Sequence, residues 1–494
     1  MDKKGFTQIV LIVLVTVLVF SNIFQNKFVV DDSGFISWPE IKALQNIPNL
    51  LKGAFPKNHS ITYRPLSSVQ LAFNYYFWGE NPAGYHLGPL FFHLLTTVFV
   101  YLLILEITKK KSAAFIGGLL FGLHPVHVEG VTYISAAIGG TSSAFFMLAS
   151  LYFYIRRFYL ISIVFAALSF FTHEITLVLI PILVLYDLCF RKFNLSLVKT
   201  YLLRYLPYVA LAAGYFLVRL VLVGPGLSRG AYLADSFPLT MLTMTKVLVQ
   251  YLWVLVWPVN LVNNHIISPG IEAFVYRNYR TAAIAAQSFF DLDILLSITI
   301  IIFMIFIIFI LRKKHPIVSF CIGWFFISLL PVMELVPQGS MMNERLLYLA
   351  SFGVVLITTY GLLKLKNKKL ITFLTCLLVI FYGTRTFIRN RDWHDDISLW
   401  QADVRLSPGQ NAYAYFALGN AYNDRKQYDL AIEQYAKSIE INPGFAVGWA
   451  SLGRTYADMG KIAEAIANYK QALAIDPNFQ EVKINLNNIY NKGL

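Results

Sequence analysis

The chain has 494 residues, of which 57% are hydrophobic and 14% are charged, and its mean hydropathy is +0.58. So few polar side chains cannot cover a soluble globule, which excludes a cytosolic enzyme, a disulfide-rich secreted domain and a disordered tail. The net charge of +14 is concentrated in residues 1–389, which hold 31 Lys and Arg against 15 Asp and Glu. This excess favours the cytoplasmic loops of a membrane protein over a nucleic-acid-binding surface, and no nucleic-acid partner is expected.

Apolar runs suited to crossing a bilayer recur along the first 389 residues. They lie at 6–25, 86–107, 112–124, 131–155, 158–171, 174–190, 201–223, 291–311, 316–333, 346–364 and 370–389. Segment 239–257 contains Lys246 and Gln250, and a full crossing there would turn the basic loop 312–314 outward. We therefore expect this segment to be re-entrant or interfacial. The sequence predicts an all-α membrane domain of about 11 spans, with an upper bound of about 13.

Short loops rich in Lys and Arg orient these spans, because such loops remain in the cytoplasm. Clusters at 109–111 and 312–314 then face inward. The outer face receives the first loop (26–83), the loop 124–130, the region 224–290, the loop 334–345 and the C-terminal part of the chain.

The C-terminal part has a period of 34 residues. Tyr415, Leu418, Gly419, Tyr422, Ala431, Tyr435 and Pro443 recur as Trp449, Leu452, Gly453, Tyr456, Ala465, Tyr469 and Pro477. This pattern predicts two tetratricopeptide repeats at 412–445 and 446–479, with an end helix at 480–490 in a domain spanning 412–494. Because about three repeats are needed for stability, we expect these two to pack against the connector 390–411 or the membrane domain.

The first outer loop contains two adjacent acids, Asp31 and Asp32, directly after the first span. Ionisable groups near a membrane are often functional, although solvated loop acids or a helix start would also explain them. Further along the loop, Trp38-Pro39-Glu40 precedes apolar residues at helical spacing. This pattern predicts an amphipathic interfacial helix over 39–53.

Other candidate residues lie in separate outer loops. Arg64 is suited to holding a phosphate, or to reaching lipid headgroups. His124 and His127 with Glu129 are suited to metal binding, to contacts with phosphate or sugar, or to capping. Glu344 and Arg345 follow in the loop 334–345, where they could simply pair with each other. The sequence contains no glycine-rich phosphate loop, nucleophile elbow or HExxH motif.

The order of these motifs resembles one known family. The acid pair, Tyr63-Arg64-Pro65-Leu66, the segment 81–86, the segment 124–130, Glu344-Arg345 and Arg391-Asp392-Trp393 precede the repeats in that order. The chain thus resembles the transmembrane and tetratricopeptide-repeat-containing O-mannosyltransferases of the GT-C glycosyltransferase superfamily. Its short repeat array looks like that of a prokaryotic member.

The resemblance implies a multi-pass enzyme that transfers a mannose-like sugar from a polyprenyl-phosphate carrier to a protein hydroxyl. Asp31 or Asp32 would be the base of an inverting displacement. The phosphate and sugar would be held by Arg64, His124, His127, Glu129, Glu344 and Arg345. The repeat groove would bind the acceptor through Tyr415, Asn420, Trp449 and Arg454.

The sequence does not decide whether the enzyme uses a metal. No cofactor is required by the residues, but a divalent metal is compatible, with Asp31 and Asp32 as its ligands. The expected location is a prokaryotic plasma membrane with the site and the repeats on the outer face, or the endoplasmic reticulum membrane in a eukaryote. Two other hypotheses of function are a flippase or transporter of lipid-linked sugars and a membrane-anchored repeat scaffold.

Overall fold

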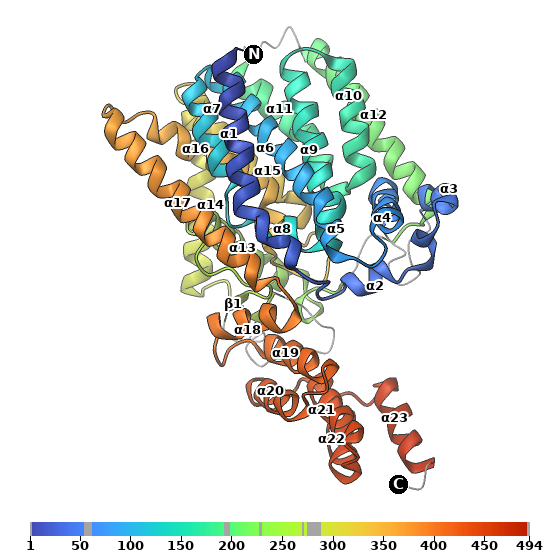
Figure 1. Cartoon of the computed structure of the whole chain (residues 1–494). Helices are drawn as coiled ribbons and strands as arrows, with labels where there is room; N and C mark the ends of the chain where they lie inside the picture. Colours follow the sequence, from blue (N-terminus) through green and yellow to red (C-terminus); the bar gives the residue numbers. More distant parts are fainter. Residues whose placement is uncertain are drawn as a thin grey trace.

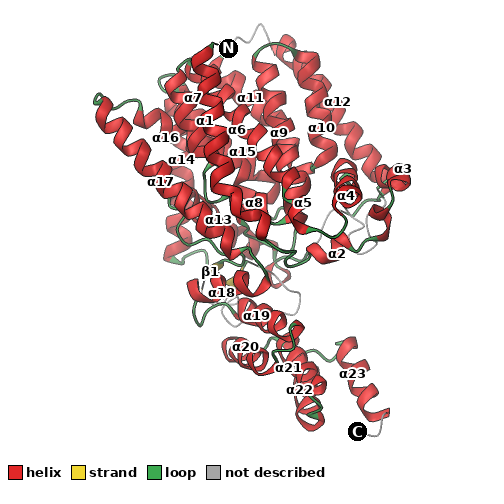
Figure 2. Cartoon of the chain, in the orientation of Figure 1, coloured by secondary structure: helices red, strands yellow, loops and turns green. Residues whose placement is uncertain are grey.

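The computed structural model describes residues 2–53, 62–191, 198–226, 230–268, 271–273 and 288–491. Helices make up nearly all of this structure (Figure 2), as a large bundle followed by a smaller stack of helices (Figure 1). The N-terminus lies at one end of the bundle, and the C-terminal helices extend from the other. We name the latter the repeat end.

The bundle contains helices that follow the apolar runs of the sequence. The longer ones are α1 (Lys3–Phe20), α6 (Leu87–Thr108), α9 (Ile134–Ile155), α12 (Val198–Leu222), α13 (Phe237–Val256), α14 (Leu292–Leu311), α16 (Leu347–Leu362) and α17 (Lys368–Asp392). The shorter ones are α4 (Pro65–Trp78), α5 (Pro82–Tyr85), α7 (Lys111–Gly122), α8 (His127–Thr132), α10 (Tyr159–Thr172), α11 (Leu179–Phe190) and α15 (Pro316–Leu329).

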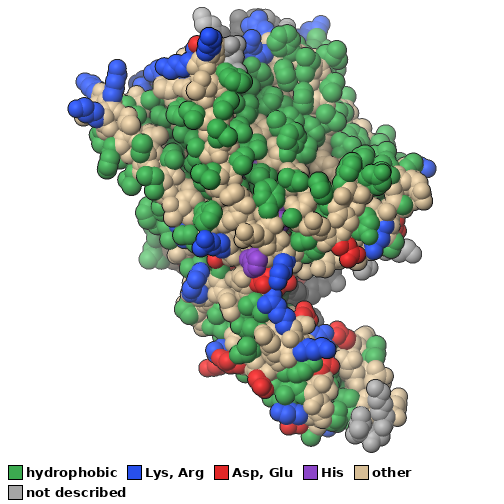
Figure 3. Space-filling view, in the orientation of Figure 1, with side chains coloured by type: hydrophobic (Ala, Val, Ile, Leu, Met, Phe, Trp, Pro, Cys, Tyr) green, Lys and Arg blue, Asp and Glu red, His purple; other side chains and the backbone are tan. Residues whose placement is uncertain are grey.

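Within the described residues, eight helical segments are long and apolar enough to cross a membrane, and α7, α10 and the Pro316–Val332 segment are shorter apolar helices. The predicted all-helical, multi-pass architecture is confirmed. Hydrophobic side chains cover most of the bundle surface, whereas Lys, Arg, Asp and Glu gather toward its ends and on the repeats (Figure 3). This distribution is the one that a bilayer requires.

Helix α13 is long enough to span a membrane, and the segments before and after it are held by hydrogen bonds to other parts of the chain. Before it, the Gly230 N–H donates to the Pro337 carbonyl (3.2 Å). After it, the Asn263 N–H donates to Asp403 (2.8 Å), in the segment that leads into the repeats. Both contacts lie beyond the ends of a continuous 20-residue helix, and the expected re-entrant or interfacial placement of this segment stays a prediction.

The single interfacial helix predicted over 39–53 is wrong. The structure has three short pieces there instead: η2 (Pro39–Lys42), η3 (Leu44–Asn46) and α3 (Ile47–Leu51). Ala43 has an extended backbone and separates η2 from η3. Pro48 explains the second break, because it lacks the N–H that a continuous helix would need and restricts the residue before it. The apolar side chains Ile41 and Leu50 are nevertheless buried, so the segment still packs on the bundle.

Helix α9 is interrupted near the repeat end. Ile138 and Gly139 have non-helical backbone angles, and Gly139 has φ +89°. A Cβ at Gly139 would lie 2.0 Å from the Ser67 Oγ of α4, so the glycine permits both the turn and the close approach of the two helices. The first turn of α9 is thereby separated from the rest of the helix and faces the first outer loop.

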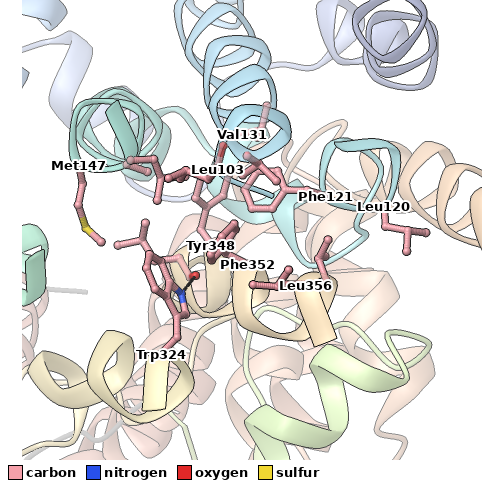
Figure 4. Packing of buried hydrophobic residues seen from close by; sticks show 14 of the residues in the cluster. Leu103, Leu120, Phe121, Val131, Met147, Trp324, Tyr348, Phe352 and Leu356 are labelled. Atoms are coloured by element: carbon pink, nitrogen blue, oxygen red, sulfur yellow. Dashed lines mark hydrogen bonds between the residues drawn. The ribbon is translucent and has the colours of Figure 1, made fainter. Parts of the chain in front are cut away.

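The centre of the bundle is packed with large apolar side chains from α6, α7, α8, α9, α15 and α16 (Figure 4). Trp324 is fully buried there, and its indole N–H donates to the Leu349 carbonyl (2.7 Å), which satisfies a polar group that lipid could not. This centre is a closed core. The polar groups of interest lie at its repeat end.

The C-terminal helices are α18 (Asp396–Leu406), α19 (Ala412–Asp424), α20 (Tyr428–Ile441), α21 (Ala446–Asp458), α22 (Ile462–Ile475) and α23 (Gln480–Asn491). A short antiparallel pair, β1 (Ile266–Ser268) and β2 (Ile271–Glu272), lies between them and the bundle. Glu272 accepts hydrogen bonds from the Ala412 N–H (2.9 Å) and the Asn264 side chain (2.8 Å). The repeats therefore lean on the membrane domain, as their small number predicted.

Candidate active site at the repeat end of the bundle

Asp32 is anchored in the structure by buried hydrogen bonds. It begins the short helix α2 (Asp32–Ile36), and its side chain is fully buried. Its carboxylate accepts from the N–H groups of Val29 (3.2 Å) and Ser135 (2.8 Å) and from the Ser135 hydroxyl. Ser135 lies in the first turn of α9, where backbone N–H groups have no helical partner and attract negative charge.

Burial raises the pKa of the Asp32 carboxyl to about 7, and the hydrogen bonds from Ser135 and Val29 oppose this only in part. The adjacent charge of Asp31 raises the pKa further. Asp32 therefore changes its protonation state near neutral pH while its position remains fixed by three donors.

Asp31 has the opposite environment, because its side chain is exposed. Its Oδ1 accepts hydrogen bonds from the Ser135 hydroxyl (2.9 Å) and from the Tyr133 hydroxyl. Burial, followed by the charge of Asp31, holds the pKa of Tyr133 well above its usual value, so Tyr133 remains a neutral donor. The Asp31 carboxylate is thus oriented on one side and open on the other.

A cation lies beside this pair. The Arg345 guanidinium pairs with Glu129, whose other oxygen accepts the Arg345 N–H (3.0 Å), and it lies 5.7 Å from the centre of the Tyr133 ring. The Arg345 side chain remains 30% exposed, so a charged donor next to Tyr133, the hydrogen-bond partner of Asp31, is partly open to its surroundings.

We name this group the acid site and define it as Asp31, Asp32, Glu129, Tyr133, Ser135 and Arg345. Four of its members were predicted from the sequence. Tyr133 and Ser135 were not, because neither residue type marks a site and only the fold brings the first turn of α9 to the first loop. An oriented, open carboxylate next to a guanidinium can accept a proton and contact an anion in one place.

The structure places Arg64 elsewhere. It precedes α4, and its guanidinium forms a two-pronged pair with Glu174 at 2.7 Å and 2.6 Å. Because this pair occupies the fork of the guanidinium, Arg64 is a bridge between α4 and η5 (Glu174–Val178) in this structure.

The two histidines belong to the core. His124 Nε2 lies 3.1 Å from the Leu255 carbonyl, and His127 Nε2 lies 2.8 Å from the Ser351 hydroxyl. Both side chains are fully buried. The His127 ring packs against aromatic neighbours such as Tyr348. Their contacts are those of packing groups.

Glu344 and Arg345 face different ways and do not pair. The Glu344 carboxylate is buried 3.6 Å from Arg389 Nη2 and 3.4 Å from His265 Nε2. Arg345, its neighbour, pairs with Glu129 instead. Of the two residues, only Arg345 therefore contributes to the acid site.

Two of the four predicted acceptor residues of the repeats have hydrogen-bond partners within the repeats. Asn420 accepts from the Tyr435 hydroxyl (2.7 Å), and the Trp449 indole donates to the Pro443 carbonyl (3.0 Å). Tyr415 is buried in the first helix of the repeats, and its assignment to the acceptor groove stays a prediction. Arg454 is half-buried in the second repeat.

Among the residues that the structure describes, no three His, Cys, Asp or Glu side chains are grouped as metal ligands. At the acid site the carboxylates of Asp31 and Asp32 are engaged by hydroxyl and N–H donors.

Comparisons with known proteins agree with the architecture. The tetratricopeptide repeat family model matches residues 412–445 and 446–479. Protein O-mannosyl-transferase TMTC3 of Mus musculus is 25% identical over 497 residues, which cover 90% of this chain and 52% of the relative. Protein O-mannosyl-transferase F38B6.6 of Caenorhabditis elegans is 24% identical, with 90% and 64% covered. The tmtc2 protein of Xenopus laevis is 32% identical over 108 residues, covering 20% of this chain and 13% of the relative.

The fold and the acid site define a multi-pass helical membrane protein, with tetratricopeptide repeats at the same end of the bundle as the acid site. More particularly, the chain is a relative of the transmembrane, repeat-containing protein O-mannosyltransferases, and the resemblance drawn from its motifs is confirmed. The chain spans about half the length of the first curated relatives that it matches. Those relatives are animal proteins, so a prokaryotic origin remains a prediction.

The raised pKa of Asp32 predicts a stability that falls as pH rises. Its folded pKa, about 7, exceeds the ordinary 3.8, so folding favours the protonated form. This contribution is complete below about pH 4 and is lost as pH rises through about 7, a change on the order of 4 kcal/mol. Asp32→Asn, which cannot ionise, should therefore flatten the decline in thermal unfolding midpoint between about pH 5 and about pH 8 in detergent.

Asp395→Asn is the matched control. Burial opposes ionisation there, but hydrogen bonds from Ser398 and Arg425 lower the pKa of Asp395 to about 2. Asp395 remains ionised throughout the tested range, so its loss should shift the unfolding midpoint without changing the slope. Burial also raises the pKa of Asp403 and Glu334 to about 7, so the Asp32 variant retains their share of the slope. An identical slope in wild type and Asp32→Asn would contradict the assignment.

Proposed function

We propose that the acid site transfers a mannose-like hexose from a polyprenyl-phosphate carrier to a hydroxyl of a protein, on the outer or lumenal side of a membrane. The relatives' names supply the reaction class. The observation that carries the proposal is that an open carboxylate, Asp31, and a partly exposed guanidinium, Arg345, both contact Tyr133 at the repeat end. A transporter would instead place such groups near the middle of the bundle.

Asp31 is the base in this proposal, and Asp32 positions it. A base must reach the proton that it removes, which an exposed carboxylate can do. Asp32 is fully buried and spends both oxygens on Val29 and Ser135. Because the two residues are adjacent, anchoring Asp32 inward turns Asp31 outward.

The displacement proceeds with inversion at the anomeric carbon. The acceptor oxygen forms the new bond to that carbon as the bond to the carrier phosphate breaks, and the hydroxyl proton passes to Asp31. Phosphate leaves as a stable anion, so it requires a cation and no acid, unlike the alkoxide that departs in glycoside hydrolysis. Arg345 supplies the cation, and Glu129 fixes its direction.

Positioning contributes much of the rate. An aspartate is a weak base for an alcohol, so the proton moves late, once the new bond is forming. Holding the acceptor and the donor together then lowers the barrier by avoiding a loss of freedom in the reaction itself. The repeats extend from the end that carries the acid site, where their groove can hold an extended acceptor peptide.

Asp31→Asn should lower the transfer rate by about 10²–10⁴-fold, since it removes the base and retains the shape. Transfer of a radiolabelled sugar from a polyprenyl-phosphate donor to a co-purified acceptor measures it in detergent. Asp32→Asn should lose less activity, because Asp32 acts through position. Full transfer by a folded Asp31→Asn protein would remove Asp31 from the mechanism.

Arg345→Lys and Arg64→Lys form a matched pair that separates the two arginines. Lysine retains the charge but lacks the planar fork, so at Arg345 we expect the donor to bind less well and the rate to fall by about tenfold or more. At Arg64 the change disturbs a pair with Glu174, so thermal stability should fall and donor KM should remain near that of wild type. Equal effects on donor KM would argue against Arg345 as the phosphate contact.

Deleting residues 412–494 should narrow the set of proteins that are modified while a free hydroxyl peptide at high concentration is still glycosylated. The connector 390–411 is retained in this variant because it contacts the membrane domain. Glycoproteomic comparison of cells carrying the full and shortened chains measures the outcome. An unchanged acceptor set would exclude the repeats from acceptor choice.

A further inference from the structure

The segment that leads from α17 to the repeats contacts the first outer loop along several residues. The Asn26 side chain donates to the Asn390 carbonyl (3.0 Å), and the Lys27 N–H donates to the His394 carbonyl (2.8 Å). The Val30 N–H donates to Asp396 Oδ1 (2.8 Å). The residues before Asp31 are therefore laid against the connector by hydrogen bonds.

Val30 has an unfavourable backbone conformation directly before the acid pair. Its φ is +55°, in the left-handed region that a β-branched side chain strongly disfavours. Such a conformation persists only where surrounding contacts hold it. The hydrogen bond from the Val30 N–H to Asp396 is one such contact, and that from the Val29 N–H to Asp32 is another.

Trp393 supports the acid site from below. Its side chain is fully buried, and its ring stacks on Tyr133 with centroids 5.3 Å apart and planes inclined at 28°. Tyr133 in turn donates its hydroxyl hydrogen bond to Asp31. Of these three residues, only Asp31 touches the proposed reaction, so Trp393 acts through Tyr133.

The other side of the connector holds the repeats. Asp395 caps α18 through the Ser398 N–H (3.0 Å) and pairs with Arg425 at the end of α19 (2.7 Å). Asp395 thus contacts the first repeat, and its neighbour Asp396 contacts the first outer loop. If the first repeat moved relative to the bundle, the contacts of Asp396 with Val30 and of Trp393 with Tyr133 would both change.

We propose that the connector is a positioning element of the acid site, in which Trp393 and Asp396 set the direction of the Asp31 carboxylate and transmit the position of the repeats to it. This proposal rests on the proposed function in one respect: the coupling would regulate sugar transfer by the repeat domain only if the acid site transfers sugar. The coupling itself is a property of the fold and can be measured without any turnover.

The chemical reactivity of Asp31 reports this coupling directly. The purified full chain in detergent is treated with a water-soluble carbodiimide and glycine ethyl ester, and amide formation at Asp31 is followed by mass spectrometry. Lys27 and Lys42 bracket the acids, so trypsin releases them on one peptide, whose fragments separate Asp31 from buried Asp32. Asp396→Ala and Trp393→Ala should each raise the labelling rate of Asp31 by about fivefold, the change expected from losing the net free energy of one hydrogen bond.

Conservative variants separate positioning from general damage. Trp393→Phe retains a ring against Tyr133 and should label at nearly the wild-type rate. Arg425→Ala leaves the bundle untouched and removes one contact between the connector and the first repeat, so it should raise the labelling of Asp31 in the same direction. Glu433→Ala removes a surface carboxylate that pairs only with Lys437 within its own helix, and it should change nothing.

Val30→Gly provides a rescue. Glycine adopts a positive φ without strain, so the turn before Asp31 should depend less on Asp396. In the Asp396→Ala background, Val30→Gly should return labelling toward the wild-type rate and restore part of any lost sugar transfer. A merely structural role for Asp396 predicts no such restoration.

The outcomes distinguish the two proposals. Unchanged Asp31 labelling in folded Asp396→Ala and Arg425→Ala proteins overturns the coupling, whatever the enzyme does. Raised labelling supports the coupling even where the wild-type chain transfers no sugar, a result that would instead reject the proposed function. If Trp393→Ala does not fold, Asp396→Ala and Arg425→Ala decide the matter.

Discussion

The hydrogen bonds between Asp32 and the first turn of α9 fix the arrangement on which the acid site depends. A carboxylate removed from water must find donors, and the start of a helix offers N–H groups that the helix cannot use. Ser135 provides both its N–H and its hydroxyl. With Asp32 held inward, the chain can only present Asp31 outward, next to Tyr133 and Arg345. The break at Gly139 separates this first turn from the rest of α9, so its donors can bind Asp32 in the first outer loop.

The bilayer imposes the second constraint, because lipid drives no apolar association between helices and close packing must do so. Gly122 illustrates this. A Cβ there would lie 2.5 Å from the Thr16 Oγ1 of α1, so glycine allows α7 to approach α1 closely. α7 is short, and its end leads directly to α8, the helix that carries Glu129. Tight packing near the repeat end therefore helps to place an acid that pairs with Arg345, more than two hundred residues away in the chain.

The sequence predicts those features that depend on local pattern. Apolar runs predict the helices of the bundle, and the 34-residue period predicts the repeats, since both patterns express periodic burial. The acid pair and Arg345 are found for a similar reason: charged residues beside a membrane are rare and stand out. Proline explains the failure at 39–53, where the apolar spacing was helical but Pro48 prevents a single helix.

The sequence does not reveal which charged residues pair with each other in the fold. Arg64 and Arg345 look alike in the chain, yet Arg64 pairs with Glu174 and Arg345 with Glu129, because only the fold decides which acid lies within reach. Glu344 faces Arg389 rather than its neighbour for the same reason. Tyr133 and Ser135 carry no distinctive pattern, and the motif Arg391-Asp392-Trp393 does not show what Trp393 contacts. The roles of these residues depend on contacts between segments more than a hundred residues apart.

The charge balance of the acid site gives the raised pKa of Asp32 a functional meaning. The acid site contains three carboxyl groups, those of Asp31, Asp32 and Glu129, and a single guanidinium, that of Arg345. If all three were ionised, an anionic sugar phosphate would meet a clear excess of negative charge. Burial raises the pKa of Asp32 to about 7, which removes part of that charge near neutral pH, and Glu129 is already paired with Arg345. Asp31 is then the one carboxylate left to act on a neutral hydroxyl, next to a cation that remains partly open to the phosphate. The same burial that anchors the loop thus reduces the repulsion that a lipid-linked donor would otherwise meet.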